Sequence, residues 1–137
     1  MVLTDMLENC NGFDIMGHYD YICRYAPYDD PRMLYRDFPD LFDKIFSLLT
    51  AKNKALELNT ATSSFFRKKG LADYMPDPEI FRQYAKAGGK YVTYGSDAHC
   101  VERLFDLYTE VLPFLKSLGF DQLTYYKDRK PVLYDIE

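Results

Sequence analysis

Apolar residues recur along the chain at two different spacings, and the change from one to the other predicts alternating strands and helices. Short runs rich in aliphatic and aromatic residues predict strands at 13–18, 54–59, 91–94, 120–126 and 131–136. Apolar residues three and four positions apart predict helices at 2–10, from Pro39 to Asn53, from Asp77 to Gly88, and at 102–118. After the first helix, the order β-α-β-α-β-α-β-β is typical of an α/β protein with a mostly parallel sheet and right-handed crossovers.

Local residues mark where several of these helices begin and end. Asp77 precedes Pro78, and aspartate is a strong N-cap while proline is favoured at the first helical position. Gly88 then stops this helix. Pro113 inside the predicted helix 102–118 is expected to kink it or to split it in two. The polar segment 60–73 is expected to be a loop.

Composition narrows the class of protein. The chain has 137 residues, 47% of them hydrophobic and 28% charged, which is typical of one globular domain. Its net charge of −4 and mixed signs argue against a nucleic-acid partner. No apolar run approaches the roughly 20 residues of a membrane helix, the first residues predict no signal peptide, and three cysteines fit a reducing compartment. We therefore expect a cytoplasmic protein with no membrane or nucleic-acid partner.

Candidate chemistry gathers just after the strand at 91–94. That strand runs into Gly95, which we expect to free the backbone, and Asp97 and His99 follow. In extended backbone, side chains two positions apart point the same way. A carboxylate and an imidazole converging beyond a strand's C-terminal end suit a divalent metal. Alternatively, Asp97 caps a turn and His99 is a surface residue.

A second strand ends in the same way. Residues 13–17 run through Gly17 into His18, with Asp20 following and Arg24 further along the loop. Two strands that each deliver a histidine after a glycine strengthen the metal hypothesis. The loop that follows is polar and broken by prolines, and its length favours a functional role.

Two further segments carry polar groups. The strand 54–59 places Glu57 and Asn59 on one face, which must therefore look onto something polar. The segment Arg67-Lys68-Lys69-Gly70 is the most basic stretch of an acidic chain. It is either a solvated charge run or a clamp for an anion.

Taken in order, these pieces resemble a known family. Gly17-His18-Tyr19-Asp20 with Arg24-Tyr25, then Leu56–Thr60, then Gly95–His99 closely resemble the C-terminal half of histidinol-phosphate phosphatases of the polymerase-and-histidinol-phosphatase (PHP) family. The resemblance covers about residues 12–136. It implies the C-terminal part of a distorted (β/α)7, TIM-like barrel with two or three divalent metals at its strand ends. It also implies hydrolysis of L-histidinol phosphate, a small phosphate-ester substrate, in histidine biosynthesis.

The resemblance assigns roles to individual residues. His18, Asp97 and His99 match metal ligands of the family, and their donor types suit Zn, Mn or Fe. Arg24 and Arg67 are candidates for binding the phosphate, because a guanidinium meets two phosphate oxygens at once. Asn59 is expected at the edge of the site, in contact with substrate. Glu57, one pleat deeper, is expected to be an internal hydrogen-bond partner.

The chain also departs from the family. The family's opening His-x-His motif lies in an N-terminal half that has no counterpart here, and the chain has only two histidines. We therefore expect residues 1–137 to form a single incomplete domain, as a truncated gene product, a split protein or an expressed fragment. Alone, it is expected to lack full activity and to associate with the missing half or a second copy. Two alternatives stay open: a PHP enzyme acting on another phosphate ester, or a non-catalytic fragment that works through a partner.

Overall fold

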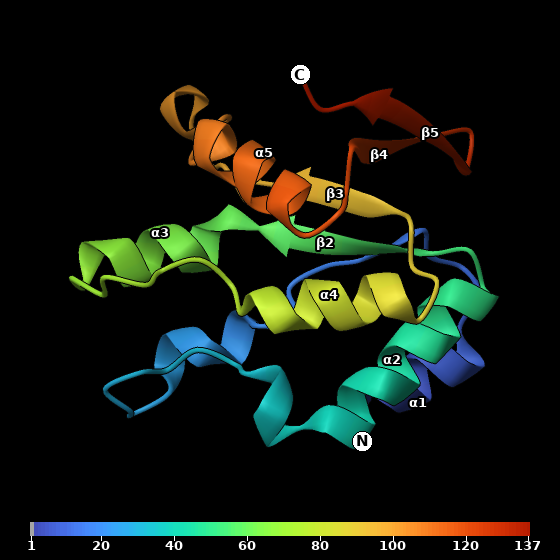
Figure 1. Cartoon of the computed structure of the whole chain (residues 1–137), viewed down its shortest axis with the longest axis horizontal. Coiled ribbons are helices and arrows are strands. Elements are labelled where there is room, and N and C mark those ends of the chain that lie inside the picture. The colour runs from blue at the N-terminus through green and yellow to red at the C-terminus, as the bar shows by residue number, and fades with distance from the viewer. Residues whose placement is uncertain (1) are drawn as a thin grey trace.

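The computed structural model describes residues 2–137 and has a mixed α/β architecture (Figure 1). Its α-helices are α1 (Val2–Asn9), α2 (Pro39–Ala51), α3 (Thr60–Lys68), α4 (Pro78–Lys86) and α5 (Tyr108–Ser117). Its strands are β1 (Ile15–Met16), β2 (Ala55–Asn59), β3 (Val92–Gly95), β4 (Gln122–Lys127) and β5 (Lys130–Asp135). Three short 3-10 helices complete the chain: η1 (Tyr21–Tyr25), η2 (Tyr35–Asp37) and η3 (Val101–Arg103).

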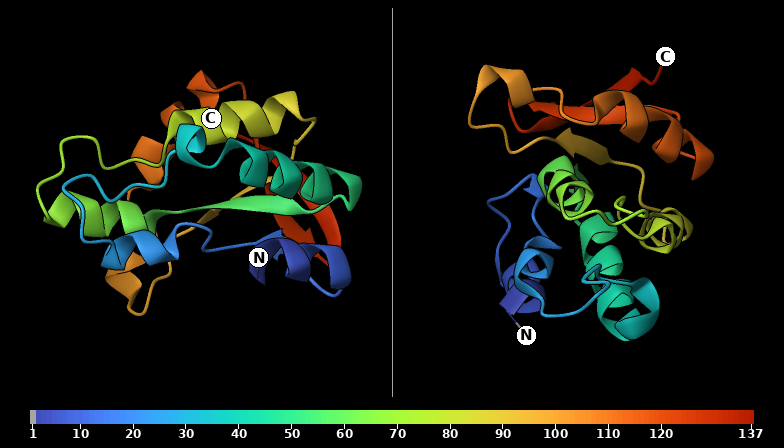
Figure 2. Two further views of the ribbon diagram at one scale, coloured as in Figure 1. Left: turned by 90° about the horizontal axis from the view of Figure 1, so that it is seen from below. Right: turned by 90° about the vertical axis from the view of Figure 1, so that its left-hand side faces the viewer.

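The strands form a parallel sheet and a separate hairpin. β1, β2 and β3 pair in parallel in the order β1-β2-β3, with Met16 opposite Leu56 and Leu56 opposite Val92. β4 and β5 form an antiparallel hairpin, and β4 lies against β3 without joining its sheet. The expected α/β class and mostly parallel sheet are therefore confirmed, whereas the order of a partial barrel is not established. Helices α2, α4 and α5 lie on one side of the parallel strands (Figure 2), and the ring of Phe81 in α4 lies 6.2 Å from that of Phe114 in α5.

The helix boundaries largely follow the local signals. The Asp77 side chain accepts a hydrogen bond of 3.0 Å from the Glu79 amide at the start of α4, as an N-cap should. Beyond the end of α4, Gly88 adopts a φ of +88°, a conformation that glycine enters without strain. The longest helix, α2, has 13 residues. No helix within residues 2–137 combines the length and the apolar character needed to cross a membrane.

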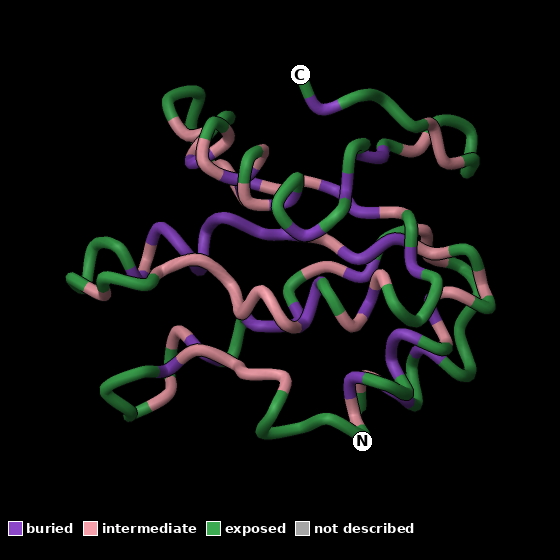
Figure 3. Tube along the Cα trace, viewed as in Figure 1, coloured by how far each residue is buried: buried purple, intermediate pink, exposed green. Residues whose placement is uncertain are grey.

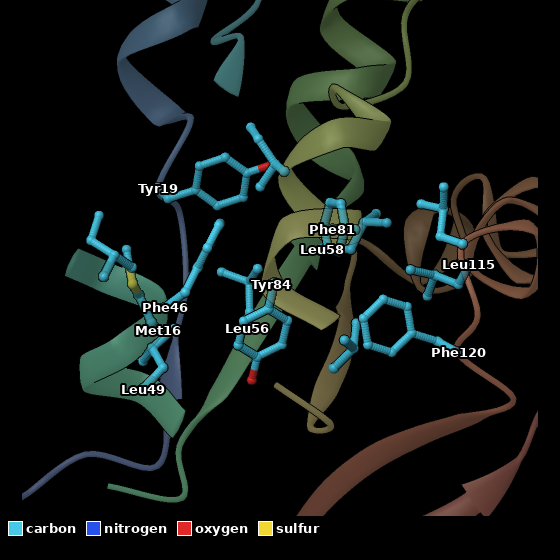
Figure 4. Packing of buried hydrophobic residues seen from close by; sticks show 14 of the residues in the cluster. Met16, Tyr19, Phe46, Leu49, Leu56, Leu58, Phe81, Tyr84, Leu115 and Phe120 are labelled. Carbon is cyan, nitrogen blue, oxygen red and sulfur yellow. The ribbon is translucent and has the colours of Figure 1, made fainter. Parts of the chain in front are cut away.

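A core of aromatic and aliphatic side chains packs between the parallel sheet and helices α2, α4 and α5 (Figures 3 and 4). Phe46 of α2, Tyr84 of α4 and Leu56 of β2 are all 0–1% exposed, and the rings of Phe46 and Tyr84 lie 5.5 Å apart. The Tyr84 hydroxyl donates to the carbonyls of Lys54 and Tyr91. Each such side chain contributes about 1.5–3 kcal/mol through burial, so this core fixes the strands from which the polar loops project.

Two predicted segments differ from the structure. Residues 60–73 were expected to form a loop, but Thr60–Lys68 form α3. The Asn59 side chain caps it by accepting a hydrogen bond of 2.9 Å from the Ala61 amide. Burial of residues 60–64 then outweighs the weak helix propensity of threonine and serine. The start of this helix did have a local signal, because Asn59, the last residue of β2, is a favourable N-cap residue.

The predicted helix 102–118 is shorter than expected. α5 begins only at Tyr108, because Leu107 takes a left-handed backbone with φ 59° and separates α5 from η3. Pro113 lies inside α5 and does not end it. The break therefore lies upstream of the proline, where the sequence carries no glycine or proline to signal it.

Candidate metal and phosphate site

The three predicted metal ligands lie just beyond the ends of β1 and β3. His18 follows β1, and Asp97 and His99 follow β3, so all three lie at the C-terminal edge of the parallel sheet, on the two strands that flank β2. Asp97 Oδ2 lies 3.7 Å from His18 Nε2, and Asp97 Oδ1 lies 3.5 Å from His99 Nε2. The His18 side chain is 45% exposed and that of His99 is 85% exposed. Asp97 thus lies within reach of both imidazoles.

The donor types and these separations can be compared with a metal site. With metal–ligand distances of about 2.0–2.2 Å, two ligands of one tetrahedral ion lie about 3.4 Å apart. The two separations at Asp97 are close to this value, and imidazole and carboxylate are suitable donors. Within residues 2–137, however, no group of three His, Cys, Asp or Glu side chains is arranged to hold an ion. Binding would therefore require these side chains to turn, or further ligands from outside the chain.

The backbone at two of these residues is strained. His18 has a φ of 59° and Asp97 a φ of 49°, in the left-handed region that few residues other than glycine occupy. Strain of this kind persists only where the surrounding structure enforces it, and it concentrates at functional sites. His18 and Asp97 are two of the six described non-glycine residues with positive φ. The other four, Asn53, Leu107, Asp128 and Arg129, are not among the predicted ligands, so the strain agrees with the ligand assignment without singling it out.

Glu57 lies beneath the site and explains why positions 17 and 95 are glycines. Its Oε2 accepts hydrogen bonds from the His18 amide at 3.2 Å and from Asn59 Nδ2 at 3.2 Å. A Cβ added at Gly17 would lie 2.7 Å from Glu57 Oε2, and one at Gly95 would lie 2.1 Å from Glu57 Oε1. Neither glycine has a positive φ among the described residues. The expectation that Gly95 frees the backbone is therefore wrong, because both glycines instead make room for this carboxylate.

Glu57 has the internal hydrogen-bonding position expected for it, and Asn59 is engaged in a similar way. Asn59 is only 4% exposed and caps α3 through its side-chain oxygen. Its Nδ2 donates to Glu57 and lies 3.5 Å from His18 Nε2. The asparagine thus lies at the edge of the site, where its amide contacts His18 from the buried side.

Arg24 reaches the site from η1. Its Nη1 lies 3.7 Å from Asp97 Oδ2, and its Nε donates to Thr62 Oγ1 at 3.1 Å. The Thr62 hydroxyl in turn donates to Asp20 Oδ1 at 3.4 Å. Burial raises the pKa of Asp20 to about 6, although the Arg24 charge and the Thr62 hydrogen bond both oppose this rise. Thr62 and Asp20 thus hold the guanidinium of Arg24 beside Asp97.

Arg67 lies elsewhere. Its Nη1 donates to Glu110 at 3.2 Å, its Nη2 lies 3.7 Å from Asp106, and its guanidinium covers the ring of Tyr74. Glu110 lies in α5, Asp106 lies just before it, and Tyr74 lies between α3 and α4. Arg67 is also not among the residues that line the pocket beside Asp97 and His99.

A pocket of about 280 Å³ opens beside the predicted ligands. Asp97 and His99 line it together with three cations, Arg24, Lys68 and Arg103. In the sequence, Lys68 is one residue of the basic segment 67–70, and Arg103 lies inside the helix predicted at 102–118. Only the fold brings η1, α3 and η3 together around one pocket. A larger hollow of about 740 Å³ is lined by residues of the segment 22–38 and includes none of the predicted ligands.

Known proteins resemble this chain in both sequence and structure. No protein-family model matches it. It is 29% identical over 130 residues to the histidinol-phosphatase of Lactococcus lactis subsp. lactis, which covers 95% of this chain and 46% of that protein. It is 37% identical over 111 residues to a probable histidinol-phosphatase of Thermotoga maritima, covering 81% and 43% respectively.

A solved structure agrees. The crystal structure of the Lactococcus lactis histidinol phosphate phosphatase, complexed with Zn, L-histidinol and phosphate, matches with a TM-score of 0.78 and 26% sequence identity. The match covers 94% of this chain and 47% of that one. The chain spans about half the length of the curated relatives it matches. In sequence and in fold, the chain is therefore a homologue of the histidinol-phosphatases along nearly its whole length.

Proposed function

We propose that this chain forms part of a metal-dependent phosphatase that hydrolyses L-histidinol phosphate to L-histidinol and phosphate. The likeness to histidinol-phosphatases along 95% of the chain supports this reaction. The observation that carries the proposal is the position of Asp97, 3.7 Å from His18 and 3.5 Å from His99, at the C-terminal ends of two parallel strands. A phosphatase that depends on divalent ions needs such a site.

In this proposal, His18, Asp97 and His99 hold a divalent ion, for which Zn, Mn and Fe are the candidates. Such ions, when bound, polarise a phosphoryl group and lower the pKa of water so that it can attack near neutral pH. Glu57 keeps His18 in place by accepting its amide hydrogen.

The two arginines and Asn59 serve the substrate and the ligands in this proposal. Arg24, already 3.7 Å from Asp97, neutralises the phosphate oxygens that do not react. Arg67 joins it only after releasing Glu110 and Asp106. Asn59 steadies the imidazole of His18 from the buried side, and substrate reaches it only at the edge of the site.

The remaining ligands come, in this proposal, from another polypeptide segment, either a separate part or a second copy of this chain. Two observations favour this view: the chain has only two histidines, and no three of the candidate ligands among residues 2–137 are arranged around one point. Alone, the chain is then expected to bind metal weakly and to turn over substrate poorly. The same test would also recognise the two alternatives, an enzyme that acts on another small phosphate ester and a non-catalytic chain that only associates with a partner.

The test measures metal content and turnover together. The purified chain is loaded with Zn or Mn, its bound metal is measured by mass spectrometry, and phosphate release from L-histidinol phosphate is followed alone and with the unmatched remainder of the Lactococcus lactis enzyme. We expect metal binding that Asp97→Asn weakens at least about tenfold, and turnover only in the mixture. Asp128→Asn, on the exposed β4–β5 turn, is the control and should change neither quantity.

Different results would contradict different parts of the proposal. Metal binding that is equal in wild type and Asp97→Asn would refute the ligand assignment. A monodisperse monomer with enzyme-like turnover would refute the need for another segment. Turnover of other phosphate esters in preference to L-histidinol phosphate would refute the substrate.

A further inference from the structure

The pocket beside Asp97 and His99 has a charge opposite to that of the chain as a whole. The chain carries a net charge of −4, yet three cations and one carboxylate line this pocket. The cations come from three separate segments: Arg24 from η1, Lys68 from the last turn of α3, and Arg103 from η3. Gathering three cations in one pocket is costly through mutual repulsion unless an anion neutralises them.

Neighbouring acids compensate these cations only in part. Arg103 Nη2 lies 3.4 Å from Asp106 Oδ2, but Asp106 also accepts a hydrogen bond of 2.6 Å from Ser64 and lies 3.7 Å from Arg67. Arg24 shares Asp97 with the two histidines. Across residues 2–137, no carboxylate forms an ion pair with Lys68. The pocket therefore retains uncompensated positive charge.

An unsatisfied donor points to the same conclusion. Arg24 Nη2 is buried and lacks a hydrogen-bond partner in the part of the chain that the structure describes. A buried guanidinium nitrogen without an acceptor costs roughly 1–3 kcal/mol. Because this nitrogen is closed to solvent, an anion in the adjoining pocket would become its acceptor once the Arg24 side chain turns toward the pocket. The pocket volume of about 280 Å³ is close to the lower end of ligand pockets, about 300 Å³.

We propose that Lys68 and Arg103, together with Arg24, bind the phosphate group of a monoester dianion in this pocket, next to Asp97 and His99. This inference rests on the proposed function for its substrate. It adds Arg103, which the sequence did not single out, and it selects Lys68 from the basic segment 67–70. Arg103 offers its guanidinium from a half-buried position beside Asp106, and Lys68 supplies an exposed point charge. Both residues determine affinity for the phosphate group and do not take part in bond breaking.

The test measures binding of inorganic phosphate to the full chain by isothermal titration calorimetry, with EDTA present so that no metal contributes. Arg103→Gln and Lys68→Gln should each weaken phosphate binding about tenfold, as the loss of one charge-assisted contact implies. The matched controls are Lys69→Gln, one residue beyond Lys68 and outside the pocket lining, and Arg36→Gln, whose side chain is 81% exposed. Neither control should change the affinity by more than about twofold.

The outcomes separate this inference from the proposed function. If all four variants bind phosphate equally well, the inference is refuted, even where the metal-loaded mixture turns over L-histidinol phosphate. If phosphate binding depends on Lys68 and Arg103 while no phosphatase activity is found, the pocket is an anion site and the proposed reaction fails. Circular dichroism of each variant checks that a loss of phosphate binding is not caused by a loss of folding. Lys68→Glu should weaken phosphate binding further than Lys68→Gln.

Discussion

The packed core and the loops beyond the C-terminal ends of the parallel strands are stabilised in different ways. In the core, Phe46 of α2, Leu56 of β2 and Tyr84 of α4 are 0–1% exposed and packed among other apolar side chains. Beyond the C-terminal ends, His18 and Asp97 have left-handed backbone conformations, and His99 is 85% exposed. Burial stabilises the first region directly, whereas the second is held in an unfavourable geometry by a few hydrogen bonds. The packed region therefore supplies the stability on which the strained site depends.

Glu57 connects these two regions. It lies on β2, whose neighbouring residues Leu56 and Leu58 belong to the core, while its carboxylate accepts the His18 amide. Each alternate residue of this one strand therefore faces a different environment. A single strand of this sheet therefore anchors both the core and the site. The effects of substitutions in the two regions should be separable by experiment.

The largest expected effect comes from removing core packing. Phe46→Ala should lower the free energy of unfolding by about 3–5 kcal/mol, because a fully buried phenyl ring is replaced by a cavity. Urea unfolding followed by circular dichroism measures this change. Phe105→Ala, at a ring that is 73% exposed, is the control and should stay within about 0.5 kcal/mol of wild type. Similar losses at both positions would contradict the packed core described here.

An intermediate effect is expected where the site meets the strand. Gly95→Ala should destabilise the chain by about 1–3 kcal/mol, because the new methyl group would overlap the Glu57 carboxylate. In a Glu57→Ala background the same change should cost less than about 0.5 kcal/mol, and the double-mutant cycle measures this coupling. Gly12→Ala, whose nearest neighbour would be Cys10 at 3.9 Å, is the control. An unchanged cost without Glu57 would show that Gly95 serves another purpose.

The smallest effect concerns the strained backbone. His18→Gly should be more stable than His18→Ala by about 1 kcal/mol, because glycine adopts a φ of 59° without the Cβ penalty. At His99, which is not among the described residues with positive φ, alanine should be at least as stable as glycine. Thermal unfolding of the four variants makes the comparison. Equal stability of the two His18 variants would mean that the backbone there carries no strain.

Local signals in the sequence predicted much of the fold. Asp77 and Pro78 begin α4 as expected, because an N-cap and a first-turn proline act only on the backbone of the first helical turn. The strands predicted at 120–126 and 131–136 are confirmed as β4 and β5, and Asp128 and Arg129 take positive φ values in the turn that joins them. The start of α5 could not be predicted, because the left-handed Leu107 that delays it has no local signature.

The site divides in the same way. The residue types that follow each strand can be read from the sequence alone, and they identified His18, Asp97 and His99 as candidate ligands. The expectation that Asp97 and His99 lie two positions apart on extended backbone is wrong, because Asp97 has a left-handed φ of 49°. The sequence also singled out Arg24, but only the tertiary structure decided that Lys68 and Arg103 accompany it. Arg67 and Lys68 are neighbours in sequence, yet on a helix consecutive side chains point about 100° apart. Arg67 therefore pairs with Glu110, while Lys68 faces the pocket with Arg103, a residue 35 positions further along the chain that only the packing of η3 near α3 brings to it.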